Sequence, residues 1–157
     1  RYNLDVLERS LFMKYKKIIA WFLFVLWLVL IFYFSNQPGN VSSNLSNNVL
    51  KTILNHLTVS NFNVLAGILR KLAHFTEYFI LSILTLNLLK QYYEIEAREF
   101  MFVMLFCFFY ACTDEFHQLF ILNRGSSFLD VLLDYTGSLL YLTLNGFIRN
   151  LKGDKID

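Results

Sequence analysis

The chain has 157 residues, of which 56% are hydrophobic and only 17% are charged. A soluble domain of this length rarely reaches that apolar content, because its surface must carry charge. The net charge of +2 is small and scattered along the sequence, which argues against a nucleic-acid-binding surface. We therefore expect an all-α integral membrane protein whose partner is the lipid bilayer and not a nucleic acid.

The first long apolar segment covers residues 18–34 and comes after a basic stretch that begins at Met13. This length of helix measures about 25 Å, just enough to cross the bilayer core. The residues after it do not resemble a small-residue cleavage site, so we predict an uncleaved first helix. Residues 1–12 are polar and differ in composition from the apolar helix. We expect them to be an upstream or vector-derived remnant, and residues 13–157 to form a single membrane domain.

A predicted turn at residues 35–39 leads into a segment with a different pattern. Apolar residues recur there at helical spacing among serines and asparagines, at Val41, Leu45, Val49, Ile53 and Leu57. This spacing predicts a short extracytoplasmic amphipathic helix that lies on the membrane surface. A polar loop is the alternative.

Three further apolar segments, residues 63–89, 100–122 and 128–148, predict a bundle of about four transmembrane helices. Basic residues gather in alternate flanks of these helices, at Lys14, Lys16, Lys17, Lys90, Arg98, Arg149, Lys152 and Lys155. The positive-inside rule places these flanks and both termini in the cytoplasm. Residues 35–63 and 123–127 are then expected outside.

Ionisable residues on three of the predicted helices fall at a common depth in the outer half of the bilayer. They are Arg70, Lys71, His74 and Glu77 on the second helix, Asp114, Glu115, His117 and Gln118 on the third, and Asp130 and Asp134 on the fourth. By helical spacing most of them share one face on each helix, while Lys71 and Glu115 lie off these faces. Intramembrane charges are costly and commonly functional, so we expect the shared faces to point into the bundle.

The same region has an excess of two negative charges when Arg124, in the turn after the third helix, is included. Four explanations stay open: a divalent metal ion, protonated histidines, raised carboxyl pKa values, or a cationic ligand group.

Several motifs of this chain, taken in order, resemble the VanZ-like family of small bacterial membrane proteins. They are Phe34-Ser35-Asn36-Gln37-Pro38-Gly39, Arg70-Lys71-x-x-His74-Phe75-x-Glu77-Tyr78, Asp114-Glu115-x-His117-Gln118-x-Phe120, Arg124, Asp130 and Asp134-x-x-Gly137. The resemblance implies a multi-pass protein of the bacterial cytoplasmic membrane that acts at the cell surface, and the family's namesake is linked to teicoplanin resistance. In this family Asn is expected as often as Asp at position 134, which ranks Asp134 below Asp130.

The leading functional hypothesis is an outward-facing intramembrane site that binds a lipidated or lipid-linked cell-envelope ligand. Candidate ligand-binding residues are Arg70, Lys71, Gln118, Arg124 and Asp134. An acyl or polyprenyl tail would lie against Phe75, Phe79, Phe116 and Phe120, although lipid-facing side chains are the simpler interpretation of these aromatics.

The alternative is an intramembrane hydrolase or transferase, with or without a metal, that acts on a lipid-linked substrate. Candidate acid, base or metal-ligating groups are His74, Glu77, Asp114, His117 and Asp130, with His117 as a general base oriented by Asp114. A purely structural role, with ion pairs Arg70–Glu77 and Arg124–Asp130 fixing the helices, also stays open. A proton-coupled transporter is less favoured because no internal repeat is visible.

Overall fold

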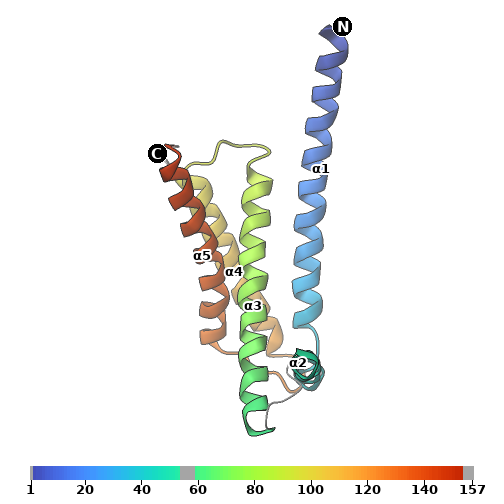
Figure 1. Cartoon of the computed structure of the whole chain (residues 1–157), viewed down its shortest axis with the longest axis vertical. Helices are drawn as coiled ribbons and strands as arrows, with labels where there is room; N and C mark the ends of the chain where they lie inside the picture. Colours follow the sequence, from blue (N-terminus) through green and yellow to red (C-terminus); the bar gives the residue numbers. More distant parts are fainter. Residues whose placement is uncertain (1, 54–58, 154–157) are drawn as a thin grey trace.

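A computed structural model describes residues 2–53 and 59–153, and its regular elements are all helices. They are α1 (Tyr2–Ser35), α2 (Gly39–Ile53), α3 (Val59–Leu89), α4 (Ala97–Gln118) and α5 (Phe128–Leu151). All except α2 are long and apolar enough to cross a membrane. In Figure 1 these four run lengthwise while α2 is seen nearly end-on, so it lies across their direction. The predicted all-α bundle of four spanning helices and one short amphipathic helix is confirmed.

Different helix ends and connections lie at the two ends of the bundle. Helix α1 begins and α5 ends at the same end, where the connection between α3 and α4 also lies (Figure 1). Helix α2 and the connection between α4 and α5 lie at the opposite end. This is the arrangement that four spans with both termini on one side require. Which end faces the cytoplasm stays a prediction, and two residues of the predicted patterns, Leu57 and Lys155, lie outside the described residues.

Helix α3 is the central element, since it contacts α1, α2, α4 and α5. Its Tyr78 and Leu81 are fully buried, and α4 contributes Val103, Cys107 and Ala111 to the same core. These three residues recur every fourth position and therefore form one stripe along α4. Because lipid is as apolar as a leucine side chain, close van der Waals packing of such stripes holds the helices together.

Helices α3 and α5 approach closely through a pair of small residues. A Cβ atom added to Gly137 would overlap the carbonyl oxygen of Phe75, so this position has room only for glycine. Next to it, the Ser138 hydroxyl donates to the carbonyl oxygen of Tyr78 at 3.1 Å. Asp134 lies about one turn earlier on α5, and the close approach brings it against α3.

At least one end of each long helix differs from the sequence-based prediction by three residues or more. Helix α1 continues back through residues 2–12, and α4 ends at Gln118 instead of reaching Leu122. Beyond Gln118 the chain turns, with Asn123 at a positive φ of 58°. The Leu122 carbonyl accepts a hydrogen bond from Gly39 N at 3.1 Å, so the turn is joined to the start of α2. Apolar side chains at 119–122 made this turn look helical in the sequence.

Candidate functional site

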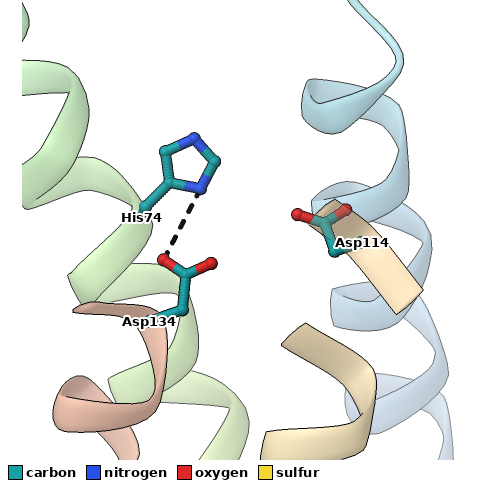
Figure 2. Close-up of side chains that lie close together, drawn as sticks. All are labelled: His74, Asp114 and Asp134. Carbon is teal, nitrogen blue, oxygen red and sulfur yellow. Dashed lines mark ion pairs between the residues drawn. The ribbon is translucent and has the colours of Figure 1, made fainter. Parts of the chain in front are cut away.

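The polar side chains converge where α3, α4 and α5 meet, at His74, Asp114 and Asp134. One imidazole nitrogen and one oxygen from each carboxylate lie within 4.8 Å of one another. His74 Nδ1 is 3.7 Å from Asp134 Oδ1, and Figure 2 shows Asp114 across from this pair on α4. We call these three residues the central cluster.

Asp134 is the most enclosed member of the central cluster, with 0% of its surface exposed. Among the described residues no group donates a hydrogen bond to either of its carboxylate oxygens, and His74 Nδ1 also lacks a hydrogen-bond partner. A buried carboxylate in this state is costly and needs a proton or a counter-charge. Asp134, which the resemblance ranked below Asp130, thus lies at the centre of the polar region, while Asp130 lies at its edge.

Asp114 is held in place by a short chain of hydrogen bonds that reaches α1. The Gln118 side-chain amide donates to Asp114 Oδ2 at 3.1 Å and to the hydroxyl of Ser35 at 3.2 Å. All three side chains are buried. Because Ser35 is the last residue of α1, this chain fixes α4 against α1 and orients the Asp114 carboxylate.

Glu77 borders the central cluster on α3. Its Oε2 lies 3.8 Å from His74 Nδ1, and the Trp27 indole nitrogen of α1 donates to the Glu77 carbonyl oxygen at 2.9 Å. The side chains of His74 and Glu77 are mostly covered. Two carboxylates therefore approach the same imidazole, one from its own helix and one from α5.

The edge of the polar region carries the more exposed charges. Lys71 Nζ lies 3.5 Å from Asp130 Oδ1, in a pair whose side chains are 62% and 33% exposed. Such a pair contributes little stability where water reaches it. Arg70 is exposed, and its guanidinium donates a long hydrogen bond of 3.4 Å to the Ser43 hydroxyl of α2. Among the described residues Arg70 has no carboxylate within ion-pair distance, so its charge is available to a ligand.

Arg124, in the connection between α4 and α5, caps the C-terminal end of α1. Its guanidinium donates to the carbonyl oxygens of Ser35 at 2.9 Å and Phe34 at 3.1 Å. The last carbonyls of a helix have no partner within the helix, and a cation there also complements the helix dipole. Burial lowers the pKa of Arg124, but an arginine stays charged under ordinary conditions.

The hydrogen bonds and ring contacts of His117 and Glu115 are with residues outside the central cluster. The His117 ring stacks on Phe32 with centroids 4.9 Å apart, and its Nε2 is 3.2 Å from Asn36 Oδ1. Glu115 Oε2 accepts the backbone N–H of Ser127 at 3.1 Å, at the start of α5. His117 therefore contacts Asn36, the residue that follows α1, in place of the contact with Asp114 that the sequence led us to expect.

The two ion pairs of the structural hypothesis are also absent from the described part of the chain. Arg70 and Glu77 do not pair, because Arg70 turns toward α2 while Glu77 faces His74. Arg124 and Asp130 do not pair either, since Arg124 is held by the end of α1 and Asp130 lies by Lys71.

Two cavities adjoin the central cluster, one polar and one apolar. The polar cavity has a volume of about 160 Å³ and is lined by Arg70, Lys71, His74, Glu115, Gln118, Asn123, Arg124, Gly125, Asp130 and Leu133. The apolar cavity has about 320 Å³, and its walls include Leu45 and Val49 of α2, Leu69 of α3 and Phe34 of α1. Arg70, His74 and Arg124 line both cavities. We call these two spaces the polar cavity and the apolar cavity.

Sequence reasoning missed part of this lining. Ser35 and Asn36, which hold Gln118 and His117, belong to the motif at the end of α1 but were assigned only to a turn. Leu45 and Val49 were expected on a helix with no particular partner. Neither cavity is lined by the four phenylalanines proposed as a tail-binding wall, and Phe116 and Phe120 are 64% and 72% exposed.

Comparison with known proteins adds one finding. The family model described as VanZ/LLP1 matches residues 20–149, which include all the residues of the central cluster and of the two cavities' walls. No curated protein and no solved structure matches the chain.

Proposed function

This chain belongs to the VanZ/LLP1 family, and from that premise we propose that it binds a lipidated or lipid-linked ligand of the cell envelope. The anionic head of the ligand occupies the polar cavity and its hydrocarbon tail occupies the apolar cavity. The observation that carries the proposal is the wall common to both spaces, formed by Arg70, His74 and Arg124. A molecule with a charged head joined to an apolar tail matches a polar space that continues into an apolar one.

The basic side chains at the edge of the polar region favour a ligand with an anionic head group. Arg70 has no carboxylate partner among the described residues, while Lys71 and Arg124 line the same cavity. Guanidinium groups bind phosphate and carboxylate through paired N–H donors. Asp130 and Glu115 also line this cavity, but each already has a partner of its own, in Lys71 and in the Ser127 amide.

The apolar cavity suits a tail that enters from the surrounding membrane. It lies between α2 and α3, and Leu45 and Val49 reach it from α2. Both residues keep much of their surface exposed, at 50% and 41%. An acyl or polyprenyl chain that covers them removes apolar surface that the protein itself leaves uncovered.

The expected orientation places this site where envelope ligands are found. With both termini in the cytoplasm, α2 and the α4–α5 connection face outward, as the distribution of lysine and arginine predicts. The site then opens on the outer side of the bacterial cytoplasmic membrane, where lipid-linked precursors and lipoglycopeptides such as teicoplanin are encountered. Binding or shielding there is our explanation for a role in teicoplanin resistance.

Growth inhibition of a teicoplanin-susceptible bacterium that expresses the chain tests this proposal. We expect protection against teicoplanin and none against a glycopeptide without a lipid tail. The Arg70→Gln variant should lose the protection at unchanged protein abundance. Arg98→Gln is the matched control, because Arg98 pairs with Glu99 at the end of the bundle away from α2. Equal protection by the Arg70→Gln variant would contradict the proposed head site.

A second candidate function, hydrolysis or group transfer on the same ligand, is favoured by one observation. The central cluster places an imidazole and two carboxylates directly beside the cavity proposed for the head, since His74 belongs to both. Such a set supplies acid, base or metal-ligating groups. Release of inorganic phosphate from a polyprenyl phosphate by the purified protein, lost in Asp114→Asn, would assign this activity.

A further inference from the structure

We propose that His74, Asp114 and Asp134 bind a divalent transition-metal cation, zinc or manganese, at the junction of α3, α4 and α5. The proposal does not depend on the ligand proposed above, because Asp114 and Asp134 are outside the walls of both cavities. It rests on three properties of the central cluster: its geometry, its burial and its charge.

The geometry offers three donor atoms of the kind that metals use, from three different helices. His74 Nδ1 and one oxygen from each aspartate lie within 4.8 Å of one another. Around a tetrahedral zinc ion with bonds of about 2.1 Å, neighbouring donors are about 3.4 Å apart. Each donor atom therefore has to move by less than about 1 Å to reach a shared ion. Rotations of the side chains supply that movement while the helices stay in place.

The spacing between His74 and Asp134 fits a shared ion better than a direct bond. Their 3.7 Å separation is longer than a hydrogen bond allows and close to the donor spacing around a metal. Figure 2 shows the two groups turned toward each other with Asp114 opposite them. A ligand at the centre of the three side chains would satisfy all of them together.

The burial of Asp134 is an independent observation. The residue is 0% exposed, and no group among the described residues donates to either of its oxygens. A carboxylate that only held helices together would be expected to accept hydrogen bonds from the protein. An unpartnered, enclosed carboxylate pointing at an unpartnered imidazole nitrogen is instead what a metal site presents without its ion.

The charge of the surroundings calls for a cation of more than one charge. When ionised, Asp114 and Asp134 carry two negative charges, and an ionised Glu77 adds a third at 3.8 Å from His74 Nδ1. Of the nearby basic side chains, Lys71 lies by Asp130 and Arg124 binds the carbonyls at the end of α1. Arg70 points toward Ser43 of α2. A divalent cation neutralises the two aspartates at the place where they meet.

The donor set narrows the choice of metal. Magnesium and calcium are bound mainly by oxygen, whereas an imidazole nitrogen favours zinc and related transition metals. Two carboxylates with one histidine suit zinc, and manganese accepts the same mixture when oxygen donors dominate. Glu77 is close enough to serve as a fourth ligand or to orient His74, the usual role of a carboxylate beside a metal-bound imidazole.

The test measures metal content in detergent-purified protein that carries no histidine tag. The protein is stripped with a chelator, loaded with zinc or manganese, freed of unbound metal, and analysed by plasma mass spectrometry. We expect one ion per wild-type chain and a loss to background in Asp134→Asn and Asp114→Asn. Asp130→Asn is the matched control, because Asp130 lies one turn earlier on the same helix and pairs with Lys71; this variant should retain the ion.

If an aspartate variant does not fold, the melting temperature of the wild-type protein with and without metal still tests the proposal. Metal should raise the melting temperature of the wild type, and a chelator should remove the gain. The Arg70→Gln variant should keep both the ion and the gain even if it binds no amphiphile, which separates this inference from the proposed function. A wild-type chain that retains no more zinc or manganese than Asp134→Asn, or that melts at the same temperature with and without metal, overturns the proposal.

Discussion

Replacing Gly137 with alanine should push α3 and α5 apart and disturb the central cluster from a distance. The added Cβ would overlap the carbonyl oxygen of Phe75, which is a backbone atom and cannot rotate away. One helix must therefore shift relative to the other. Because His74 lies next to Phe75 in α3 and Asp134 precedes Gly137 on α5, their 3.7 Å separation changes with that shift.

The magnitude results from two opposing effects. Alanine in a helix is more favourable than glycine by about 0.5–1 kcal/mol. Overfilling a packed interior costs about 1–3 kcal/mol, and the upper half of this range applies because the obstacle is backbone. The net loss is about 1–2.5 kcal/mol, or roughly 2–10 °C in melting temperature for a chain of this size.

Gly67→Ala on α3 is the matched control. Apart from the backbone of α3 itself and the two neighbouring residues, no described heavy atom lies within 4 Å of a Cβ added at that position, so the helix preference acts alone. Thermal unfolding in detergent should show Gly67→Ala melting at or above the wild-type temperature and Gly137→Ala below it. The bound metal should also fall in Gly137→Ala only. Two variants that melt alike would refute the inference that α3 and α5 are in contact at Gly137.

Two further predictions concern the end of the bundle that carries α2. Arg124→Gln should lower the free energy of unfolding by about 1–2 kcal/mol, because two carbonyl oxygens at the end of α1 lose hydrogen bonds from a charged donor, and the one at Phe34 is exposed and contributes less. Thermal unfolding measures this loss, and an unchanged melting temperature would contradict the capping role. For topology, Asn44→Cys and Gly125→Cys should react with an impermeant thiol reagent on intact cells, whereas Lys152→Cys should react only after the cells are opened. The reverse pattern would show that the predicted orientation is wrong.

Much of the fold could be predicted from sequence because the signals were local. Runs of apolar residues of membrane-spanning length predicted the four long helices, and the spacing of Val41, Leu45 and Val49 predicted α2. The end of α4 was missed for a physical reason. Residues 119–122 are apolar enough to continue a spanning helix, and only the hydrogen bond between Gly39 and Leu122 shows that they turn.

The sequence predicted which residues belong to the candidate site, but not which of them contact one another. Helical spacing and common depth selected His74, Glu77, Asp114 and Asp134, which do lie together. Spacing alone also grouped His117 with Asp114, since they are three positions apart on one helix. The packing of α1 against α4 decides otherwise, and no local pattern in the sequence shows which helices are neighbours.

The order of the two aspartates on α5 illustrates the same limit. Asp130 and Asp134 are one turn apart on one stripe, and no local pattern indicates which of them a neighbouring helix encloses. Their difference comes from the close approach at Gly137, which encloses Asp134 and leaves Asp130 at the edge beside Lys71. This is a property of two helices together.

The most direct test of the proposed function is the affinity of the purified protein for a polyprenyl phosphate and for a short-chain isoprenyl phosphate. Arg70→Gln should weaken binding of both by roughly 10- to 100-fold, the effect of losing a charged hydrogen bond. Leu45→Asn should weaken binding of the long-chain compound only. Val41→Asn, on the same helix with similar exposure but outside the apolar cavity, should bind both as the wild type does. Wild-type affinity for both compounds in Arg70→Gln and in Leu45→Asn would contradict a single site that binds head and tail.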